Sequence, residues 1–200
     1  MIEDWRRDLE VWLAPFPAAL RNKTRMRVCP AYIAGLIGPG DRKSVQPMAT
    51  RAGDVGYDQL HHFVADGVWD SAPLEAVLLK EADRLAGDEA GYLVIDDTAL
   101  PKKGRHSVGV APQYASSLGK TAGCQSLVPV VGVGDPGLRE VPVMVGLRLF
   151  LPESWTDDTG RMTRARVPLD RQQALTKPGI AIEQIDRVIA FRNPVRLRSC

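Results

Sequence analysis

The sequence predicts an α/β protein of the α+β kind, with a helical N-terminal domain followed by a sheet. Apolar residues recur at helical spacing up to about residue 88, whereas from Gly91 the apolar runs become short and rich in β-branched residues. The segment Gly134-Asp135-Pro136-Gly137 lies between two such runs and has strong turn chemistry. We therefore expect an antiparallel hairpin in the second part of the chain.

The N-terminal part predicts four short helices. The first ends at Leu13, before two prolines, and a short buried helix is expected at residues 32–37. A third has Asp54 as its expected N-cap and stops at Gly67. The fourth begins at residues 70–73 and stops at Gly87. His61 and His62 are adjacent and face different sides of a helix, so we interpret them as structural or surface residues.

A basic cluster precedes the second of these helices. Two interpretations stay open, a solvated connection into the helix and an element that contacts phosphates, because a cluster of cations is only an electrostatic footprint. Its members are Arg21, Lys23, Arg25 and Arg27.

Three strands are expected after Gly91. Residues 92–95 show no alternation, which is typical of a strand buried on both faces. The second covers residues 124–133, where Pro129 favours an edge position or a bulge. The third covers residues 139–151, and its alternation places Val143, Val145, Leu147 and Leu149 on one face.

The last part of the chain predicts a polar connection and one more helix. Residues 156–171 are polar and irregular, and Lys177-Pro178-Gly179 then opens a helix. The residues expected on its apolar side are Ile182, Ile185, Val188 and Ile189.

Composition excludes some classes of protein. The chain has 200 residues and a formal net charge of +2, so charge neither demands nor excludes a nucleic-acid partner. Three scattered cysteines form neither a disulfide framework nor a zinc spacing. No signal peptide is recognised and the apolar stretches are too short to span a bilayer, so we expect a cytoplasmic protein.

The candidate site is the stretch from Gly91 to Val110. Asp96 and Asp97 follow the first expected strand, where hard cations can reach carboxylates at the rim of a sheet. A basic turn that can hold phosphates comes next. Its members are Lys102, Lys103, Arg105 and His106. The alternative is a strand that ends in an acidic cap and a solvated turn.

Four blocks in order carry a family likeness. IDDTALPKKGRHSVGVAPQY, SLGKTAGCQ, LRLFLPESWTDD and ALTKPGIAIEQID resemble insertion-sequence transposases of the DDE superfamily, IS4-like, which have a ribonuclease H-like catalytic domain. The resemblance implies DNA cleavage and strand transfer by an Asp, Asp and Glu around two divalent ions, Mg²⁺ or Mn²⁺. It implies that Asp97, or Asp96 as second choice, is the first catalytic carboxylate and metal ligand. The basic turn would then lie near the DNA backbone.

The resemblance also implies an organisation of the chain. Residues 1–88 would be a DNA-binding region, residues 89–190 a partial ribonuclease H-like domain with a mixed sheet, and residues 191–200 an aberrant tail. The expected partners are the DNA terminal repeats of the element, a second copy of the chain, or the full-length transposase. No membrane partner is expected, and the DNA-bound protein would be found in the nucleoid.

The likeness departs from the family pattern near Phe191. The second catalytic Asp and the Glu of the family pattern do not appear after this point, and the chain continues with the Arg-rich segment FRNPVRLRSC instead. Our hypothesis is a shifted reading frame, tested by translating the other two frames of the gene. Without the following strand, we expect residues 92–95 to form an exposed edge of the sheet. We also expect metal binding to be weak or absent and the chain to be catalytically incomplete. The alternatives are a non-catalytic DNA-binding regulator of transposition and an inert product.

Overall fold

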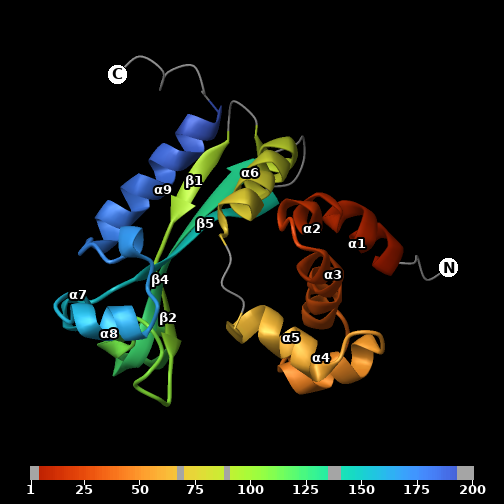
Figure 1. Cartoon of the computed structure of the whole chain (residues 1–200). Coiled ribbons are helices and arrows are strands. Elements are labelled where there is room, and N and C mark those ends of the chain that lie inside the picture. Colours follow the sequence, from red (N-terminus) through yellow and green to blue (C-terminus); the bar gives the residue numbers. More distant parts are fainter. Residues whose placement is uncertain (1–4, 67–69, 88–90, 135–140, 193–200) are drawn as a thin grey trace. The chain divides into compact units, whose positions relative to one another are not determined.

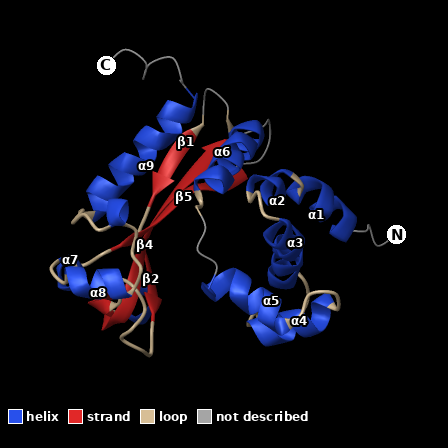
Figure 2. Cartoon of the chain, in the orientation of Figure 1, coloured by secondary structure: helices blue, strands red, loops and turns tan. Residues whose placement is uncertain are grey.

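The computed structural model describes residues 5–66, 70–87, 91–134 and 141–192 (Figures 1 and 2). They form two compact units, Met1–Lys80 and Glu81–Cys200. The first unit is helical and the second combines a sheet with helices, so the chain is an α+β protein, as the sequence predicts. The domain boundary expected between residues 88 and 89, and the expected tail from residue 193 onward, lie outside the described residues.

The first unit is built from short helices. The helix predicted to end at Leu13 is observed, and a helix that the sequence analysis did not predict follows Ser44. The elements are α1 (Trp5–Leu13), α2 (Pro15–Ala19), α3 (Lys23–Ile37), α4 (Val45–Ala52), α5 (Tyr57–His61), a π-helical turn at His62–Asp66, and the first part of α6 (Ala72–Ala86).

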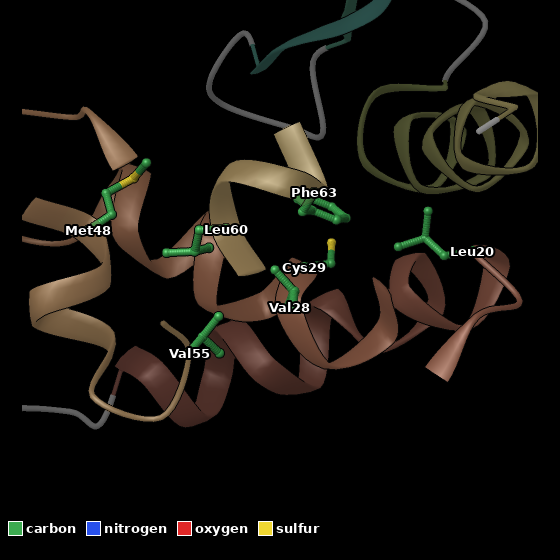
Figure 3. Packing of buried hydrophobic residues seen from close by; sticks show 7 residues of the cluster. All are labelled: Leu20, Val28, Cys29, Met48, Val55, Leu60 and Phe63. Atoms are coloured by element: carbon green, nitrogen blue, oxygen red, sulfur yellow. The ribbon is translucent and has the colours of Figure 1, made fainter. Parts of the chain in front are cut away.

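One apolar cluster holds this unit together (Figure 3). Val28 on α3, Met48 on α4 and Leu60 on α5 are at most 2% exposed, so three helices share one core. Gly35 lets α3 and α4 approach closely, because a Cβ there would lie 2.9 Å from the sulfur of Met48. Burial of such side chains stabilises by about 1.5–3 kcal/mol each.

Three members of the basic cluster, Lys23, Arg25 and Arg27, belong to α3, so the interpretation as a connection holds only for Arg21, which precedes the helix. Asn22 is the N-cap of α3, and its side-chain oxygen accepts a hydrogen bond from the backbone nitrogen of Arg25 at 3.1 Å. At the other end, Arg51 and Lys43 donate hydrogen bonds to the carbonyls of Gly35 and Gly38. These cations satisfy carbonyls that a helix C-terminus leaves open.

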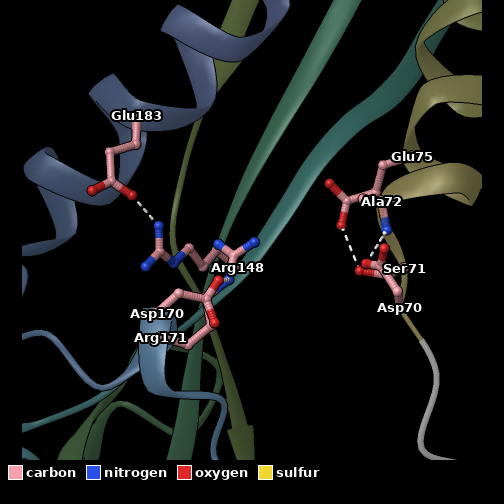
Figure 4. A network of polar contacts seen from close by, with 8 residues as sticks. All are labelled: Asp70, Ser71, Ala72, Glu75, Arg148, Asp170, Arg171 and Glu183. Carbon is pink, nitrogen blue, oxygen red and sulfur yellow. Dashed lines mark hydrogen bonds and ion pairs between the residues drawn. The ribbon is translucent and has the colours of Figure 1, made fainter.

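Two helix starts differ in how well the sequence predicted them. The prediction of Asp54 as an N-cap is wrong, because Gly56 occupies that position and donates its N–H to the side chain of Gln59. The start of α6 is confirmed, since the carboxylate of Asp70 accepts from the backbone N–H of Ala72 at 2.9 Å (Figure 4). Gly67, the expected stop of the third helix, lies outside the described residues.

The second unit contains one antiparallel sheet. The long strand β4 (Lys120–Gly134) pairs with β1 (Tyr92–Ile95), β2 (Thr98–Pro101), β3 (Ala111–Ala115) and β5 (Val141–Phe150). The predicted antiparallel arrangement of β4 and β5 is confirmed, although the turn that joins them lies outside the described residues. The sequence analysis did not predict β2 and β3, and every pairing between described strands is antiparallel rather than mixed.

The strand β1 lies at the edge of this sheet. Tyr92, Val94 and Ile95 are 50%, 44% and 43% exposed, so the prediction of a strand buried on both faces is wrong. Among the strands that the structure describes, β1 pairs with β4 alone, and the expected exposed edge is therefore confirmed.

Pro129 lies at an interruption in the pairing of β1 and β2 with β4, and the register of the pairing is the same on both sides of it. Ile95 pairs with Val130 and Thr98 pairs with Leu127, so β1 and β2 follow one register along β4 and flank residues 96 and 97. Pro129 lies opposite this break and has no N–H to donate. The predicted edge position of Pro129 is wrong, since β4 is paired along both sides.

A bulge lies close to Pro129, as the alternative interpretation of this proline predicted. Val130 pairs with Gly146 and Val131 with Met144, which leaves Val145 as an extra residue of β5. The guanidinium of Arg187 donates to the carbonyl of Val145 at 2.8 Å. The bulge also changes which side chains face inward, because Val145 is buried while Leu147 is 52% exposed. The predicted single face for residues 143–149 is therefore wrong.

The predicted last helix, α9 (Lys177–Arg192), packs on the sheet (Figure 1). Its inward face carries Ile180, Ala181 and Gln184, whereas Ile182 and Ile189 are 58% and 51% exposed. The apolar side expected from the sequence is therefore rotated. The side chain of Gln184 donates to the carbonyl of Val128 at 3.0 Å. Arg148 on β5 pairs with Glu183 (Figure 4).

The segment after β5 is more regular than expected. It forms α7 (Glu153–Thr156), α8 (Thr159–Arg164) and a 3-10 turn at Leu169–Arg171. Trp155 and Met162 are each 1% exposed, so both helices are anchored by a large apolar side chain. No helix among the described residues is long and apolar enough to cross a membrane.

Candidate functional site

The two candidate carboxylates lie beside the middle of β4, in the break between β1 and β2. Asp96 reaches β4 only through a long hydrogen bond of 3.5 Å from its N–H to the carbonyl of Pro129. Its carboxylate turns back and accepts a hydrogen bond from the N–H of Asp97 at 2.7 Å. Both carboxylates directly follow β1 at the edge of the sheet, as expected, although β2 continues the pairing along β4 beyond them. Asp97 is the carboxylate whose oxygens are turned toward another element.

Asp97 meets a cation from the far end of the unit. The ammonium of Lys177, the first residue of α9, donates a hydrogen bond to and forms an ion pair with the carboxylate of Asp97. The same ammonium lies 5.5 Å from the centroid of the Phe150 ring, at the end of β5. The side chain of Asp97 is 52% exposed and that of Lys177 is 34% exposed, so the pair is open to solvent and ions.

Lys177 is a residue that the sequence analysis did not assign to the site. One signal could have found it, because a cation at the first position of a helix opposes the helix dipole and needs a nearby anion. The first turn of α9 holds no acidic residue that could supply this anion. Asp97 supplies it from a position 80 residues earlier in the sequence.

The basic turn connects β2 to β3 and is exposed throughout. Its first residue, Lys102, donates its backbone N–H to the carbonyl of Gly123 at 2.9 Å, which continues the β2 pairing by one residue. All four residues named in the sequence analysis, Lys102, Lys103, Arg105 and His106, are exposed to solvent.

The far side of this turn is held by α7 and α8. Arg161 donates a hydrogen bond to the carbonyl of Arg105 at 3.0 Å, and its guanidinium carbon lies 3.7 Å from the centroid of the Trp155 ring. The indole nitrogen of Trp155 donates to the carbonyl of Val110 at 3.0 Å. Both ends of the segment 105–110 are thus fixed by side chains 45 residues or more away. Arg161 is a second residue that the sequence analysis missed.

Other residues with reactive or charged side chains have structural roles or are exposed. Cys124 is 0% exposed and belongs to the core of the second unit. Asp158 caps α8, because its carboxylate accepts from the N–H of Arg161 at 2.7 Å. Glu153 is exposed in the first turn of α7. In the first unit, His61 and His62 are exposed, and the ring of His61 stacks on Tyr57 with centroids 5.6 Å apart.

A divalent ion fits the site only in part. Carboxylate oxygens are the ligands that Mg²⁺ prefers, so Asp97 is suited to hold one. Within the described residues, however, no group of three His, Cys, Asp or Glu side chains comes together. These residues alone do not complete a metal site, and the negative charge of Asp97 is already balanced by the ammonium of Lys177.

Comparison with known proteins decides the family. Residues 15–197 match the model of the DDE superfamily endonucleases. The chain belongs to this family. The matched range includes Asp96, Asp97 and the basic turn, and DDE superfamily endonucleases generally use divalent metal ions.

A curated relative gives the same result. Over 99 residues, this DDE superfamily member is 32% identical to the probable transposase for insertion sequence element IS701 of Microchaete diplosiphon. The match covers 50% of this chain and 26% of that protein, so the chain aligns with about a quarter of the length of this relative.

Proposed function

We propose that the protein acts as an insertion-sequence transposase of the DDE superfamily, and that Asp97 is its first catalytic carboxylate. The observation that carries this proposal is the break in the ladder opposite Pro129. It leaves residues 96 and 97 out of the strand pairing, while the paired strands on both sides hold the Asp97 backbone in place. A ligand held in this way is well positioned and still accessible, as phosphoryl transfer requires.

A divalent ion would supply activation of the attacking oxygen and stabilisation of the leaving oxygen of a phosphodiester. Asp97 would hold it, and Asp96 is the second choice because its carboxylate is already engaged by the N–H of Asp97. Lys177 would have to release Asp97 or turn toward a phosphate when an ion binds. We expect Mg²⁺ or Mn²⁺ affinity to be weak, since a single carboxylate leaves the ion most of its waters.

DNA is the proposed partner of the basic turn. Exposed cations on a rigidly anchored loop neutralise phosphates without reading bases. The residues that would contact the backbone are Lys102, Lys103, Arg105 and His106. We extend the proposal to the helical first unit as a DNA-binding region and to the terminal repeats of the element as its target.

A second candidate function is non-catalytic binding that regulates transposition. The observation that favours it is that the described residues bring no three metal-ligating side chains together. Such a protein would bind element ends, a second copy or a longer transposase without cutting DNA. The two functions share the DNA contact and differ in cleavage.

A Mg²⁺-dependent nicking assay on supercoiled DNA that carries the element ends separates the two functions. The first predicts nicking that disappears in Asp97→Asn and is retained in part in Asp96→Asn, with both variants folded by circular dichroism. Binding without nicking by the parent chain would support the second function. Nicking that is equal in the parent and in Asp97→Asn would remove the catalytic role of Asp97.

A further inference from the structure

The start of α9 fixes Lys177 beside the candidate carboxylate. The hydroxyl of Thr176 accepts a hydrogen bond from the N–H of Gly179 at 3.1 Å, and the carbonyl of Thr176 accepts one from the N–H of Ile180 at 2.9 Å. Thr176 therefore caps the helix, and Lys177 occupies its first position. From this fixed helix end, the ammonium of Lys177 extends to the carboxylate of Asp97.

This position favours an anion beside Lys177. The amino end of a helix carries partial positive charge, so a cation at the first position is destabilised unless an anion lies close by. The first turn of α9 contains no acidic residue. In this structure the anion is Asp97, which belongs to the break between β1 and β2. The helix end and the ammonium thus attract negative charge to the same place, which is the candidate site.

A second anion can reach the same ammonium. An ammonium has three N–H donors, and the hydrogen bond to Asp97 uses one of them. Both side chains of the pair are partly exposed, so solvent screens their attraction and the exchange of one anion for another costs little. Phosphate oxygens accept charge-assisted hydrogen bonds of the same kind as a carboxylate does. The competing explanation is an ion pair that only tethers α9 to the sheet.

The basic turn lies on the same strand ladder as this pair. β2 begins directly after Asp97, and the N–H of Lys102 continues its pairing with β4. Lys102 is four residues along the strand from Thr98, which corresponds to about 13 Å. A DNA duplex advances about 3.4 Å for each base pair, so a few base pairs cover this distance. One DNA segment is therefore long enough to contact both the turn and Lys177.

We propose that Lys177 is a phosphate-binding residue of the candidate site, whose ammonium exchanges the carboxylate of Asp97 for a phosphate of the DNA backbone. This inference rests on the proposed function, in which the Asp97 site receives DNA. The exchange brings a phosphate next to the proposed catalytic carboxylate and leaves that carboxylate without its counter-charge only while DNA is bound. The contact is independent of base sequence, because the phosphate carries no sequence information.

The experiment uses the full chain and a fluorescent DNA duplex of arbitrary sequence, with affinity measured by anisotropy over a series of salt concentrations. EDTA is present, so that no metal ion takes part. Asp97→Asn releases Lys177 from its partner, and the double variant with Lys177→Gln then removes the released charge. We expect the double variant to bind several-fold more weakly than Asp97→Asn and to lose about 0.9 from the slope of log K against log salt.

The matched control takes apart a second ion pair between the sheet and α9. Glu183 lies six residues beyond Lys177 on this helix and pairs with Arg148. Glu183→Gln and its double variant with Arg148→Gln should bind the duplex with the same affinity and salt slope. An equal loss of affinity in this control would show that general charge explains the result, and the inference would be wrong.

The remaining outcomes separate this inference from the proposed function. Equal binding by Asp97→Asn and its double variant with Lys177→Gln would show that Lys177 only tethers α9. If Lys102→Ala binds weakly in that case, the inference is wrong and the basic turn remains a DNA contact. If Lys102→Ala also binds like the parent, the proposed role of the turn fails as well. A double variant that melts well below Asp97→Asn would assign Lys177 to the fold and would also overturn the inference.

Discussion

The ammonium of Lys177 at the start of α9 is paired with the carboxylate of Asp97 in the break between β1 and β2. The pair joins the start of α9 to the segment between β1 and β2, and its two residues are 80 residues apart in the sequence. Because the ammonium of Lys177 supplies the counter-charge, the candidate catalytic carboxylate is held in place without a metal ion. Asp97 is therefore positioned by the protein itself.

Replacing Lys177 with glutamine should have a small effect on stability. Both partners are partly exposed, so solvent screens the pair and its contribution is at most about 1 kcal/mol. We expect Lys177→Gln to change the free energy of unfolding in urea by no more than this amount. The same variant should bind Mn²⁺ more tightly, as detected by electron paramagnetic resonance, because Asp97 loses its competitor. Equal Mn²⁺ binding in both proteins would speak against competition at this carboxylate.

Gly146 leaves little room for a side chain. A Cβ at this position would lie 2.5 Å from the side-chain oxygen of Gln184, which packs α9 onto the sheet. We expect Gly146→Ala to destabilise the chain by about 1–3 kcal/mol, as overpacking of a core does. The measurement is the urea midpoint.

A double-mutant cycle checks the cause of this effect. Gln184→Ala removes the obstructing atoms, so the double variant should lose less stability than the sum of the single variants. Additive losses would place the strain elsewhere, for example at Arg187, whose guanidinium would lie 3.3 Å from the new Cβ.

Trp155→Phe should loosen the support of the basic turn. The change keeps most of the buried area but removes the hydrogen bond from the indole nitrogen to the carbonyl of Val110. An unsatisfied buried carbonyl costs about 1–3 kcal/mol, which a lower melting temperature would record. The amide of Val110, which donates to the carbonyl of Ser107 at 3.1 Å, should also exchange faster with solvent, because the segment 105–110 loses one of its two anchors. Unchanged exchange in a destabilised variant would show that the indole serves packing alone.

Pro129→Val should restore the missing link of the ladder. The new N–H at position 129 would face the carbonyl of Asp96, because β1 and β2 share one register there. We expect this amide to be protected from hydrogen exchange by nuclear magnetic resonance, and nicking activity to fall as Asp97 loses freedom. Exchange at the rate of an unstructured peptide would contradict the proposed reason for the break.

Burial raises the pKa of the Cys29 thiol, so its reactivity should be low at neutral pH. The folded-state pKa lies above the unfolded one, and this difference lowers stability as the pH rises above the unfolded value. In a background with Cys124→Ser and Cys200→Ser, in which Cys29 is the remaining thiol, we expect slow alkylation of the native chain that accelerates in urea. Rapid alkylation without denaturant would show that Cys29 is accessible in the folded state.

Local patterns predicted the elements that local chemistry decides. The hairpin of β4 and β5, the start of α6 at Asp70 and the opening of α9 at Lys177 all follow from turn and capping residues close in sequence. The family blocks also gave Asp96, Asp97 and the basic turn as the candidate site. Those features required no knowledge of distant contacts.

Other features depended on pairing partners far along the chain. β2 and β3 are short and the sequence analysis predicted no strand at either, because only their pairing with β4 makes them strands. The bulge at Val145 rotated the alternation of β5, and packing on the sheet chose a different face of α9. Register and burial are set by the partner, so one strand or helix alone does not reveal them.

The sequence by itself determined the family, the fold class and the carboxylates on which the proposed chemistry depends. Only the tertiary structure decided that Lys177 meets Asp97 and that Arg161 holds the turn at Arg105. The physical reason is distance along the chain. These charges and carbonyls acquire partners only when the fold has brought segments 56 to 80 residues apart into contact.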